Sequence, residues 1–409
     1  MLFAIYANRL IRGLSLALEL SHAGLSRHHW RTAVIADRLA EQLNLSLGQR
    51  KTLVYAALLH DIGAAANWKE KELLHNLKLG PFVYDHCEQG YALLKDSPQL
   101  GEIAEPIRYH HDQWAGTNPS GLAGTAIPLL SRILHLADRL EVLIQGDRHI
   151  FDQHTAIMEQ LIGLRGTYFD PVLVDALREL AQRESFWLDL VNPHYYENFF
   201  NNPNLYGQLQ FQLDDVINIA EIFASIIDKT SRFTASHSRR VATVAAYLAK
   251  LVGFSPEEVK LMWVAGLLHD LGKLAVPNTI LESPNKLTPY EFMLMKQHTY
   301  YTYRILEQID GFETVAEWAA YHHETLDGQG YPFRISGGQL NLGSRIMAVA
   351  DVFVALTEKR PYRKEMLSLA EVKKIMQQMV ANNKIDGTIT GELFGNLAAA
   401  TQLDSISWQ

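Results

Sequence analysis

The sequence predicts an all-α protein made of two tandem helical bundles that are related by internal duplication. Two observations favour this fold class. Apolar residues recur at spacings of three and four through most of the 409 residues, which is the period of an amphipathic helix, and alternating strand patterns are scarce. A repeat with a constant offset of 209 residues joins the two halves. That period is the size of a domain, whereas the repeats of a solenoid are about 20 to 50 residues long.

The first part of the repeat pairs residues 28–61 with residues 237–270. The two blocks begin HHWRTAVIADRLAEQL and HSRRVATVAAYLAKLV, and they end YAALLHD and VAGLLHD. Each block contains SLGQ or SPEE, in which a serine is followed three residues later by Gln or Glu. This capping-box pattern predicts that a new helix begins at the same place in both halves.

Histidines and aspartates fall at matching positions along the rest of the repeat. The motif YHH recurs, and SRILHLAD in the first half corresponds to SRIMAVAD in the second. Ten of the 17 histidines belong to the matched set. A single buried histidine is more often a hydrogen-bonded core residue than a ligand. Unrelated core histidines would not be expected to occur with the same neighbouring histidines and aspartates in both halves. The matched positions are His28 and His237, His60 and His269, Asp61 and Asp270, His86 and His298, His110 and His322, His111 and His323, and Asp138 and Asp351.

The repeat also predicts the domain organisation. We expect a first domain at residues 1–195, a linker at residues 196–215 and a second domain at residues 216–409. The join is expected near NPHYYENFFNNPNLYG, where Asn, Pro and aromatic residues interrupt helical periodicity. In the second half, LTPYEF predicts a helix with Thr288 as N-cap and Pro289 at its first position.

Composition excludes several classes of partner. The formal net charge of −8 gives no basic surface for DNA or RNA, so a nucleotide partner is expected to be small. The single cysteine, Cys87, excludes an internal disulfide and fits a reducing compartment. Arg9 and Arg12 interrupt the apolar N-terminal stretch, and no apolar run is long enough to cross a bilayer. We therefore expect a cytoplasmic protein without a membrane segment.

The His-Asp pair in AGLLHDLGK indicates a metal site. Both residues follow an apolar run, where an unpaired charge is costly to bury. Neighbours on a helix point about 100° apart, so the histidine can face one centre while the aspartate bridges to a second. Two metal ions would satisfy both groups, with His322 and His323 approaching from the opposite wall. Five imidazoles and two carboxylates favour iron or manganese over a structural zinc site, and other divalent first-row metals stay open.

Several motifs of the second half together resemble the HD-GYP domain, a branch of the HD phosphohydrolase superfamily that hydrolyses cyclic dinucleotides. They are HSRRVA, LLHDLGKLAVPNTIL, LTPYEFMLMKQH, HHETLDGQGYP, SRIMAVADVFVALT and RPYR, within residues 216–385. The resemblance implies a helical bundle with two or three metals that acts on cyclic di-GMP or 3′3′-cyclic GMP-AMP. Members with a third metal carry a glutamate four residues before the first histidine. Phe233 has that position here, so we expect two metals. The implied ligands are His237, His269, Asp270, His298, His322, His323 and Asp351, with Asp270 bridging.

Hydrolysis of a phosphodiester defines further candidate residues. A metal pair supplies a bridging hydroxide and binds a phosphoryl oxygen. We expect Asp270 and Lys273 to be catalytic, with the ammonium of Lys273 on the scissile phosphate, because this residue follows His269 by four on the same helix face. Gly328 and Gly330 are expected to adopt positive φ in the GYP segment. The expected substrate contacts are Lys273, Gly330, Tyr331, Pro332 and Arg345. Arg345, Arg360 and Arg363 are candidates for phosphate or structural contacts, and for each of them we favour the structural role.

The first half resembles a plain HD domain that has lost the GYP segment. GTNPSG replaces that segment, and Ala64 stands where Lys273 stands in the second half. Three interpretations are open: a metal-binding but inactive regulatory half, a second hydrolase of altered specificity, or a scaffold whose histidines satisfy each other. We put the regulatory or structural interpretation first, and we expect His29, His75 and His135 to be ordinary residues. The candidate ligands of a second metal site are His28, His60, Asp61, His86, His110, His111 and Asp138.

We therefore expect a metal-dependent phosphodiesterase that opens a cyclic dinucleotide to the linear dinucleotide in its second half. One alternative is an HD phosphohydrolase of another nucleotide, which hydrolysis assays over a nucleotide panel would identify. The other is a non-catalytic signalling module that binds a cyclic dinucleotide or a partner protein and leaves the dinucleotide intact. A homodimer and a signalling partner at the GYP segment are further expectations.

Overall fold

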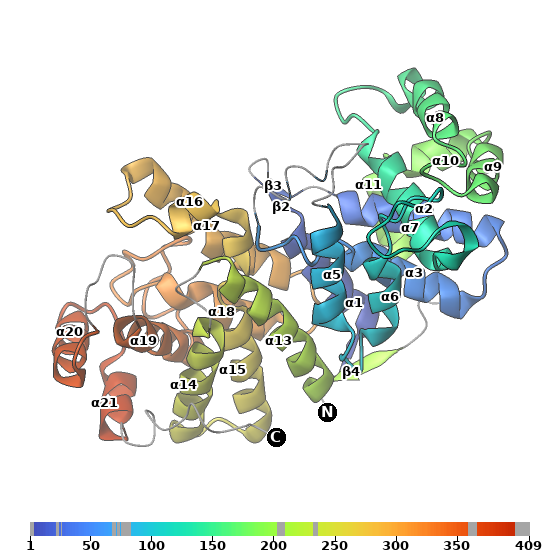
Figure 1. Cartoon of the computed structure of the whole chain (residues 1–409). Coiled ribbons are helices and arrows are strands. Elements are labelled where there is room, and N and C mark those ends of the chain that lie inside the picture. The colour runs from blue at the N-terminus through green and yellow to red at the C-terminus, as the bar shows by residue number, and fades with distance from the viewer. Residues whose placement is uncertain are drawn as a thin grey trace. The chain divides into compact units, whose positions relative to one another are not determined.

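The computed structural model of the chain is predominantly helical (Figure 1). Its strands are two or three residues long. The predicted all-α fold class is therefore confirmed. His75, Phe233, Arg360 and Arg363 lie outside the described residues. The structure describes residues 4–21, 24–25, 27–67, 71, 74, 83–202, 209–231, 236–358 and 366–396.

The chain divides into two compact units that follow the repeat. The first-repeat unit comprises Tyr6–Glu19 and Leu25–Leu209. The second-repeat unit comprises Met1–Ile5, Leu20–Gly24 and Gln210–Gln409. The domain bounds at residues 195 and 216 remain a prediction. The short strands form two pairs, β1 (Ala4–Tyr6) with β4 (Gln210–Gln212) and β2 (Leu20–Ser21) with β3 (Gly24–Leu25).

Helices form the first-repeat unit. Helix α2 packs against α3 and α7, and α5 packs against α6. The described helices of this unit are α1 (Ala7–Leu18), α2 (His28–Gln42), α3 (Leu47–Leu59), α5 (Val83–Leu94), α6 (Gly101–Arg108), α7 (Leu129–Val142), α8 (His154–Gly163), α9 (Pro171–Leu180), α10 (Glu184–Asp189) and α11 (Pro193–Phe200), with 3₁₀ turns η1 (Gly124–Ala126) and η2 (Ile150–Asp152).

The second-repeat unit repeats this packing. Helix α14 packs against α15 and α19, and α17 packs against η3 and α18. The described helices are α13 (Leu213–Lys229), α14 (His237–Leu251), α15 (Pro256–Leu268), α16 (Asn278–Leu281), α17 (Pro289–Leu306), α18 (Glu313–Ala320), α19 (Leu342–Thr357), α20 (Leu369–Ala381) and α21 (Gly387–Gly395), with 3₁₀ turns η3 (Leu271–Ala275) and η4 (Tyr321–His323).

The helix starts predicted from capping boxes are confirmed. Ser46 and Ser255 each accept a hydrogen bond from the backbone N–H of the third residue on, whose side chain accepts from the serine N–H. Thr288 caps α17 in the same way, with Pro289 at the first helical position. These bonds satisfy backbone donors that would have no partner at a helix N-terminus.

A helix also lies where the sequence analysis expects an interruption. Asn192 accepts a hydrogen bond from the backbone N–H of His194, and Pro193 occupies the first turn of α11. Proline is tolerated there because the first N–H groups of a helix have no intrahelical acceptor. The Asn-Pro pair therefore begins a helix and does not break one. Phe199 and Phe200 of α11 are buried.

Glycine allows the elements that carry the His-Asp pairs to approach their neighbours closely. A Cβ on Gly272, two residues after the second pair, would lie 2.0 Å from the carbonyl oxygen of His298. A Cβ on Gly63, two residues after the first pair, would lie 2.0 Å from the carbonyl oxygen of His86. A side chain at either position would therefore push a candidate metal ligand out of place.

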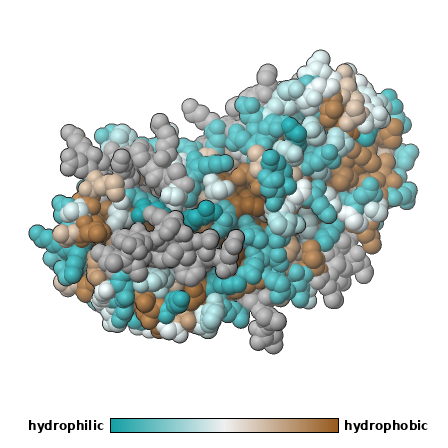
Figure 2. Space-filling view, turned by 60° about the horizontal axis from the view of Figure 1, so that its bottom comes forward, coloured by the Kyte–Doolittle hydropathy of each residue, from teal (hydrophilic) through white to brown (hydrophobic). Residues whose placement is uncertain are grey.

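Neither the described helices nor the face in Figure 2 has the features of a bilayer-spanning element. Among the described residues, no helix combines the length and the apolar character that crossing a membrane requires. Brown apolar atoms appear in separate patches between teal hydrophilic atoms on the face in Figure 2. Individual large apolar residues such as Val172, Tyr290 and Met293 are exposed, which is normal for single positions on a globular surface.

Candidate metal centres in the two repeats

The second-repeat unit brings all seven predicted metal ligands together. Six of these side chains are buried, and His323 is half-buried. The elements that supply them are distant in sequence, so the helical packing creates the cluster. His237 begins α14, His269 and Asp270 follow α15, His298 lies in α17, His322 and His323 lie in η4, and Asp351 lies in α19.

The Asp270 carboxylate lies between two groups of imidazoles. Its Oδ2 is 3.7 Å from Nε2 of His237 and 3.2 Å from Nε2 of His269. Its Oδ1 is 3.5 Å from Nε2 of His298 and 4.0 Å from Nε2 of His322. Each carboxylate oxygen therefore faces a different set of nitrogen donors, as the bridging ligand of a two-metal site would.

Asp351 and His323 complete these two groups. Oδ1 of Asp351 is 3.3 Å from Nε2 of His237 and 4.0 Å from Nε2 of His269. The ring of His323 lies 4.2 Å from that of His322, measured between centroids. The donor atoms of His237, His269 and Asp351 lie within 4.8 Å of one another, and those of His298, His322 and His323 do as well.

Backbone acceptors orient the imidazoles. Nδ1 of His269, His298 and His322 each donates to the carbonyl oxygen three residues earlier, at 2.7 Å. A carbonyl cannot donate, so Nδ1 carries a proton, and a neutral ring in this orientation presents the lone pair of Nε2. Nε2 of His298 and Nε2 of His322 are only 3.3 Å apart. Two lone pairs at that distance repel unless a cation lies beside both, which is the arrangement that metal-ligating histidines adopt.

His237 is oriented by a carboxylate, that of Glu358, which the repeat does not predict. Nδ1 of His237 lies 2.9 Å from Oε2 of Glu358, whose other oxygen accepts from Arg240 at 3.1 Å. In the first repeat, Glu141 contacts His28 and accepts from Arg31 in the same way. These glutamates follow the last aspartate of their repeats by seven and three residues, so the alignment of the halves does not pair them. Both spacings place the glutamate on the helix face of that aspartate, which is the one signal in the sequence.

The electrostatic field of the second site suits cations. Burial lowers the pKa of His298 to about 3 and that of His322 well below its usual value, so both rings are neutral. Burial alone would raise the pKa of Asp270, but His269 and the Lys273 ammonium hold it well below its usual range. Nε2 of His269 is buried without a hydrogen-bond partner in the described part of the chain. Against the effect of burial, contacts with Asp351 and Glu358 raise the pKa of His237 to about 9. Metal binding requires neutral imidazoles and ionised carboxylates, so an ion at this position would displace a proton from that ring.

Lys273 lies near the ligand cluster, but not through the helix geometry that the sequence analysis expects. Helix α15 ends at Leu268, and the chain continues in the 3₁₀ turn η3. The prediction that Lys273 shares a helix face with His269 is therefore wrong. Nζ of Lys273 instead lies 2.5 Å from Oδ2 of Asp270, three residues earlier.

A pocket of about 1130 Å³ opens over these ligands in the second-repeat unit. His237, Asp270, His298, His323 and Asp351 line it together with Lys273. Its other walls include apolar and aromatic side chains, among them Ile280, Phe292, Met295 and Tyr331. The rings of Phe292 and Tyr331 lie 6.3 Å apart at 78°. The pocket therefore places aromatic faces, a cation and the ligand cluster around one volume.

The GYP segment is built around Glu324. This buried carboxylate accepts from the backbone N–H groups of Phe333, Arg334 and Ile335, at 2.7 to 3.1 Å. The three bonds fix the loop that carries Tyr331, whose ring lies 4.9 Å from that of His323. The Tyr331–Pro332 peptide bond is cis.

Two expectations for this segment need correction. Gly328 has the predicted positive φ, +70°, but Gly330 has none. Gly330 is required for a different reason, because a Cβ there would lie 2.5 Å from the Cα of Glu324. The guanidinium of Arg345 donates to the carbonyl oxygens of Gly337 and Leu340. Arg345 is not among the residues that line the pocket, so these contacts support a structural role over the predicted substrate contact.

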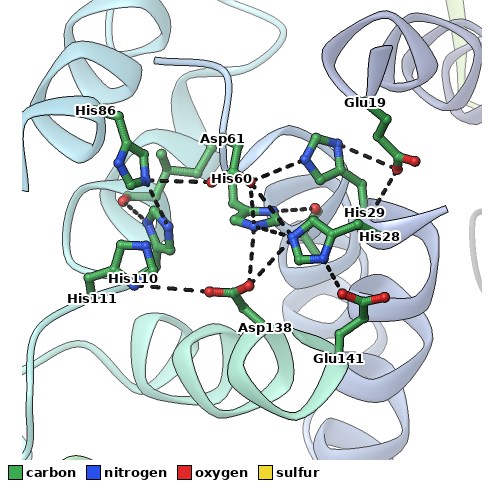
Figure 3. A network of polar contacts seen from close by, with 12 residues as sticks. Glu19, His28, His29, His60, Asp61, His86, His110, His111, Asp138 and Glu141 are labelled. Atoms are coloured by element: carbon green, nitrogen blue, oxygen red, sulfur yellow. Dashed lines mark hydrogen bonds and ion pairs between the residues drawn. The ribbon is translucent and has the colours of Figure 1, made fainter. Parts of the chain in front are cut away.

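The first-repeat unit also gathers its seven candidate ligands, as Figure 3 shows. Oδ2 of Asp61 is 3.7 Å from Nε2 of His28 and 3.2 Å from Nε2 of His60, and its Oδ1 is 3.5 Å from Nε2 of His86. Nε2 of His86 lies 3.4 Å from Nε2 of His110. Asp61 therefore bridges two groups of imidazoles in the same manner as Asp270. His111 and Asp138 lie beside them, 4.0 Å apart at their closest.

Residues outside the matched set also belong to this first cluster. His29, which the sequence analysis expects to be an ordinary residue, is 2% exposed and groups with His28, His60 and Asp61. The repeat missed it because the matching residue, Ser238, is not a ligand type. His135 is buried and packs 5.8 Å from the ring of His111 and 5.0 Å from that of Phe169.

Two cations accompany the first cluster. Arg139 is buried and donates to Oδ2 of Asp138 at 2.6 Å. Val352 has the matching position in the second repeat. Burial lowers the pKa of Lys71 to about 7, against the attraction of the Asp61 carboxylate. Neither cation was expected from the repeat, because neither has a charged counterpart there.

Comparison with known proteins assigns the family. The family model described as HD domain matches residues 13–173 and 221–389, once in each half. The chain belongs to the HD domain family. The two matches confirm tandem HD domains, of which the second carries the HD-GYP motifs.

Similar proteins with names and structures extend this result. The 3′3′-cGAMP-specific phosphodiesterase 1 of Vibrio cholerae serotype O1 is 31% identical over 385 residues, which cover 92% of this chain and 88% of that protein. A cyclic di-GMP phosphodiesterase response regulator of Xanthomonas campestris pv. campestris is 42% identical over 132 residues, or 32% of this chain and 35% of that protein. The crystal structure of a cyclic GMP-AMP specific phosphodiesterase of V. cholerae has a TM-score of 0.70 and 26% identity, and the match covers 99% of this chain and 100% of that one.

Proposed function

We propose that the second-repeat unit hydrolyses a phosphodiester bond of a cyclic dinucleotide and releases the linear dinucleotide. One observation carries the proposal. The Asp270 carboxylate lies between two groups of imidazoles and lines a pocket of about 1130 Å³. A pocket of this size and lining suits a ligand with two bases and two phosphates, since small-molecule sites occupy about 300–1,000 Å³ and are largely apolar.

Two divalent metal ions, iron or manganese, are the proposed cofactors. His237, His269 and Asp351 would hold one ion, His298, His322 and His323 the other, and Asp270 would bridge them. When bound, such a pair supplies Lewis-acid charge at the phosphoryl group and a water of lowered pKa. The mixture of imidazole and carboxylate donors supports first-row metals of this kind.

The residues of the chain have separate tasks in this proposal. Lys273 holds the scissile phosphate, because its ammonium lies beside the bridging carboxylate at the edge of the pocket. Tyr331 and Phe292 offer faces on which a purine can stack. Glu324 keeps Tyr331 in place through the three backbone bonds of its loop. Gly330 and Pro332 shape the loop.

The substrate is either 3′3′-cyclic GMP-AMP or cyclic di-GMP, and we put the former first. The relative named for 3′3′-cGAMP matches 92% of this chain, across both repeats, whereas the regulator named for cyclic di-GMP matches 32%. The first-repeat unit has a regulatory or structural role in this proposal, since Ala64 replaces the lysine of the second repeat. A cytoplasmic location, a homodimer and a signalling partner at the GYP segment are further proposals that rest on resemblance and composition.

Product analysis with matched variants tests the proposal. Metal-loaded wild type, Asp270→Ala and Asp61→Ala would be incubated with both cyclic dinucleotides and with a panel of other nucleotides. We expect Asp270→Ala to abolish hydrolysis and Asp61→Ala to leave much of it. The opposite pattern would move the active site to the first repeat. Stoichiometric binding without hydrolysis would favour the signalling-module alternative, and turnover of another nucleotide alone would favour a different HD hydrolase.

A further inference from the structure

We propose that the first-repeat unit holds a metal centre of its own and that His29 is a ligand in it, beside the same carboxylate oxygen that meets the Lys273 ammonium in the second repeat. The ion would be a divalent first-row transition metal, because the donors are imidazoles and carboxylates. The inference goes beyond the proposed function, which concerns the second repeat.

The two bridging aspartates, Asp61 and Asp270, differ in one of their neighbours. Oδ2 of Asp61 lies 3.7 and 3.2 Å from its first two histidine nitrogens, and Oδ2 of Asp270 lies at the same two distances from the matching histidines. The third neighbour differs. It is the Nζ of Lys273 in the second repeat, at 2.5 Å, and the Nε2 of His29 in the first, at 3.5 Å. The third neighbour of this oxygen is therefore an imidazole in the first repeat and an ammonium in the second. Figure 3 shows the ring of His29 beside Asp61.

The chain holds His29 in this orientation with a second carboxylate. Oε1 of Glu19 accepts from the backbone N–H of His29 at 2.7 Å and lies 3.7 Å from its Nδ1. Asp228 matches Glu19 at the offset of 209, and it accepts from both the backbone N–H and the hydroxyl of Ser238. Both repeats thus keep a carboxylate at this helix start. Only in the first repeat does this carboxylate orient an imidazole, that of His29, toward the bridging aspartate.

The position of His29 has a physical explanation if a cation lies between its ring and Asp61. At 3.5 Å, Nε2 and Oδ2 are farther apart than the 2.7–3.2 Å or so that is usual for N–H···O hydrogen bonds. A metal that accepts a bond from each atom would satisfy both.

Other buried polar atoms of this cluster also have no hydrogen-bond partner in the described part of the chain. They include both ring nitrogens of His111, Nδ1 of His86 and Oδ1 of Asp138. Leaving such a group unpaired costs about 1–3 kcal/mol. An ion could partner Oδ1 of Asp138 and one ring nitrogen of His111, and this observation is independent of the position of His29.

A ligand at this place has a consequence for chemistry. His29 adds a sixth imidazole to the first cluster, and it takes the place of Lys273 as the third neighbour of the bridging carboxylate oxygen. The ion of the first centre would therefore have more protein ligands and fewer coordination positions open to a substrate. This accounts for a half that keeps its metal ligands while Ala64 replaces the lysine.

Metal binding by the full-length chain tests the inference. The background variant carries Asp270→Ala and His298→Ala, which remove both halves of the second site. Metal-free protein is titrated with Co²⁺, followed by its visible d–d absorption, and metal content after dialysis is measured by elemental analysis. We expect the background protein to bind Co²⁺, and we expect His29→Ser, which installs the residue of the second repeat, to weaken binding at least tenfold and to alter the spectrum. His194→Ser, at an exposed histidine of the same unit, should change neither.

Two results would overturn the inference: a background protein that binds no Co²⁺, or a His29→Ser titration and spectrum that match the background. The circular dichroism spectra of the metal-free proteins control for folding. Should His29→Ser fail that control, His29→Gln fills the same space and must show the same loss. Hydrolysis of a cyclic dinucleotide by the wild type does not enter these readouts, so the proposed function and this inference stand or fall separately.

Discussion

Replacing Lys273 by methionine is the sharpest test of how the second site binds its substrate. Methionine keeps most of the stem of the side chain and removes only the charge. Lys273 lies 2.5 Å from the bridging carboxylate, and its side chain is 17% exposed. It is therefore close enough to the ligand cluster to meet a phosphate that is bound there.

The expected loss follows from Coulomb's law. Two unit charges about 4 Å apart interact by about 4 kcal/mol at an effective dielectric constant of about 20. Partial exposure screens the ammonium, so we take about 2–3 kcal/mol as the part that acts on the transition state. At about 1.4 kcal/mol for each factor of ten, Lys273→Met should lower kcat/KM by about 30- to 150-fold.

The assay is initial-rate hydrolysis of 3′3′-cyclic GMP-AMP and cyclic di-GMP, with the linear products separated by chromatography. Metal content must be measured in parallel, because a variant that loses its ions would mimic the effect. Lys260→Met is the matched control, since Lys260 is an exposed lysine of the same unit that pairs with Asp214. Wild-type kcat/KM in Lys273→Met protein with full metal content would refute the reasoning and leave Lys273 as a structural partner of Asp270.

Three further predictions concern the pocket, the packing and the metals. Phe292→Ala should raise KM by roughly 5- to 30-fold with little change in kcat, because stacking of one base contributes about 1–2 kcal/mol; an unchanged KM would remove the ring from the substrate site. Gly272→Ala should lower the urea midpoint of unfolding by an amount equivalent to about 1–3 kcal/mol, because its Cβ would meet the carbonyl oxygen of His298. Gly391→Ala, where nothing lies within 4 Å, should leave that midpoint unchanged or raise it by up to about 1 kcal/mol, and equal effects of the two variants would contradict the packing argument. Chelation should lower the melting temperature and added Mn²⁺ should restore it, since an ion at about 100 times its dissociation constant stabilises the native state by about 2.7 kcal/mol; identical melting curves would argue against bound metal.

The sequence predicts most of the scaffold because its signals are local or repeated. Capping boxes lie within four residues, so the starts of α3, α15 and α17 follow from the sequence alone. The candidate ligands stand out because the same residue types recur in the same order, at offsets of 209 to 213 residues. Two helical bundles that each gather histidines and aspartates are then a direct expectation.

The features that the sequence does not predict depend on tertiary contacts. Glu141 and Glu358 perform one task at different spacings, so no repeat relates them. His29 adjoins a predicted ligand, but its counterpart is a serine, and only the packing of the first-repeat unit turns its ring toward Asp61. Arg345 carries the right charge for a phosphate, yet the carbonyl oxygens of its own unit take its donors.

Anomalous diffraction from crystals of the metal-loaded full-length protein tests the central claim most directly. Data collected at the iron and manganese absorption edges should contain two peaks in the second-repeat unit, one on each side of the Asp270 carboxylate. The nitrogens of His237 and His269 should surround the first peak, and those of His298 and His322 the second. A single peak, no peak, or a carboxylate that touches neither ion would contradict a bridged metal pair.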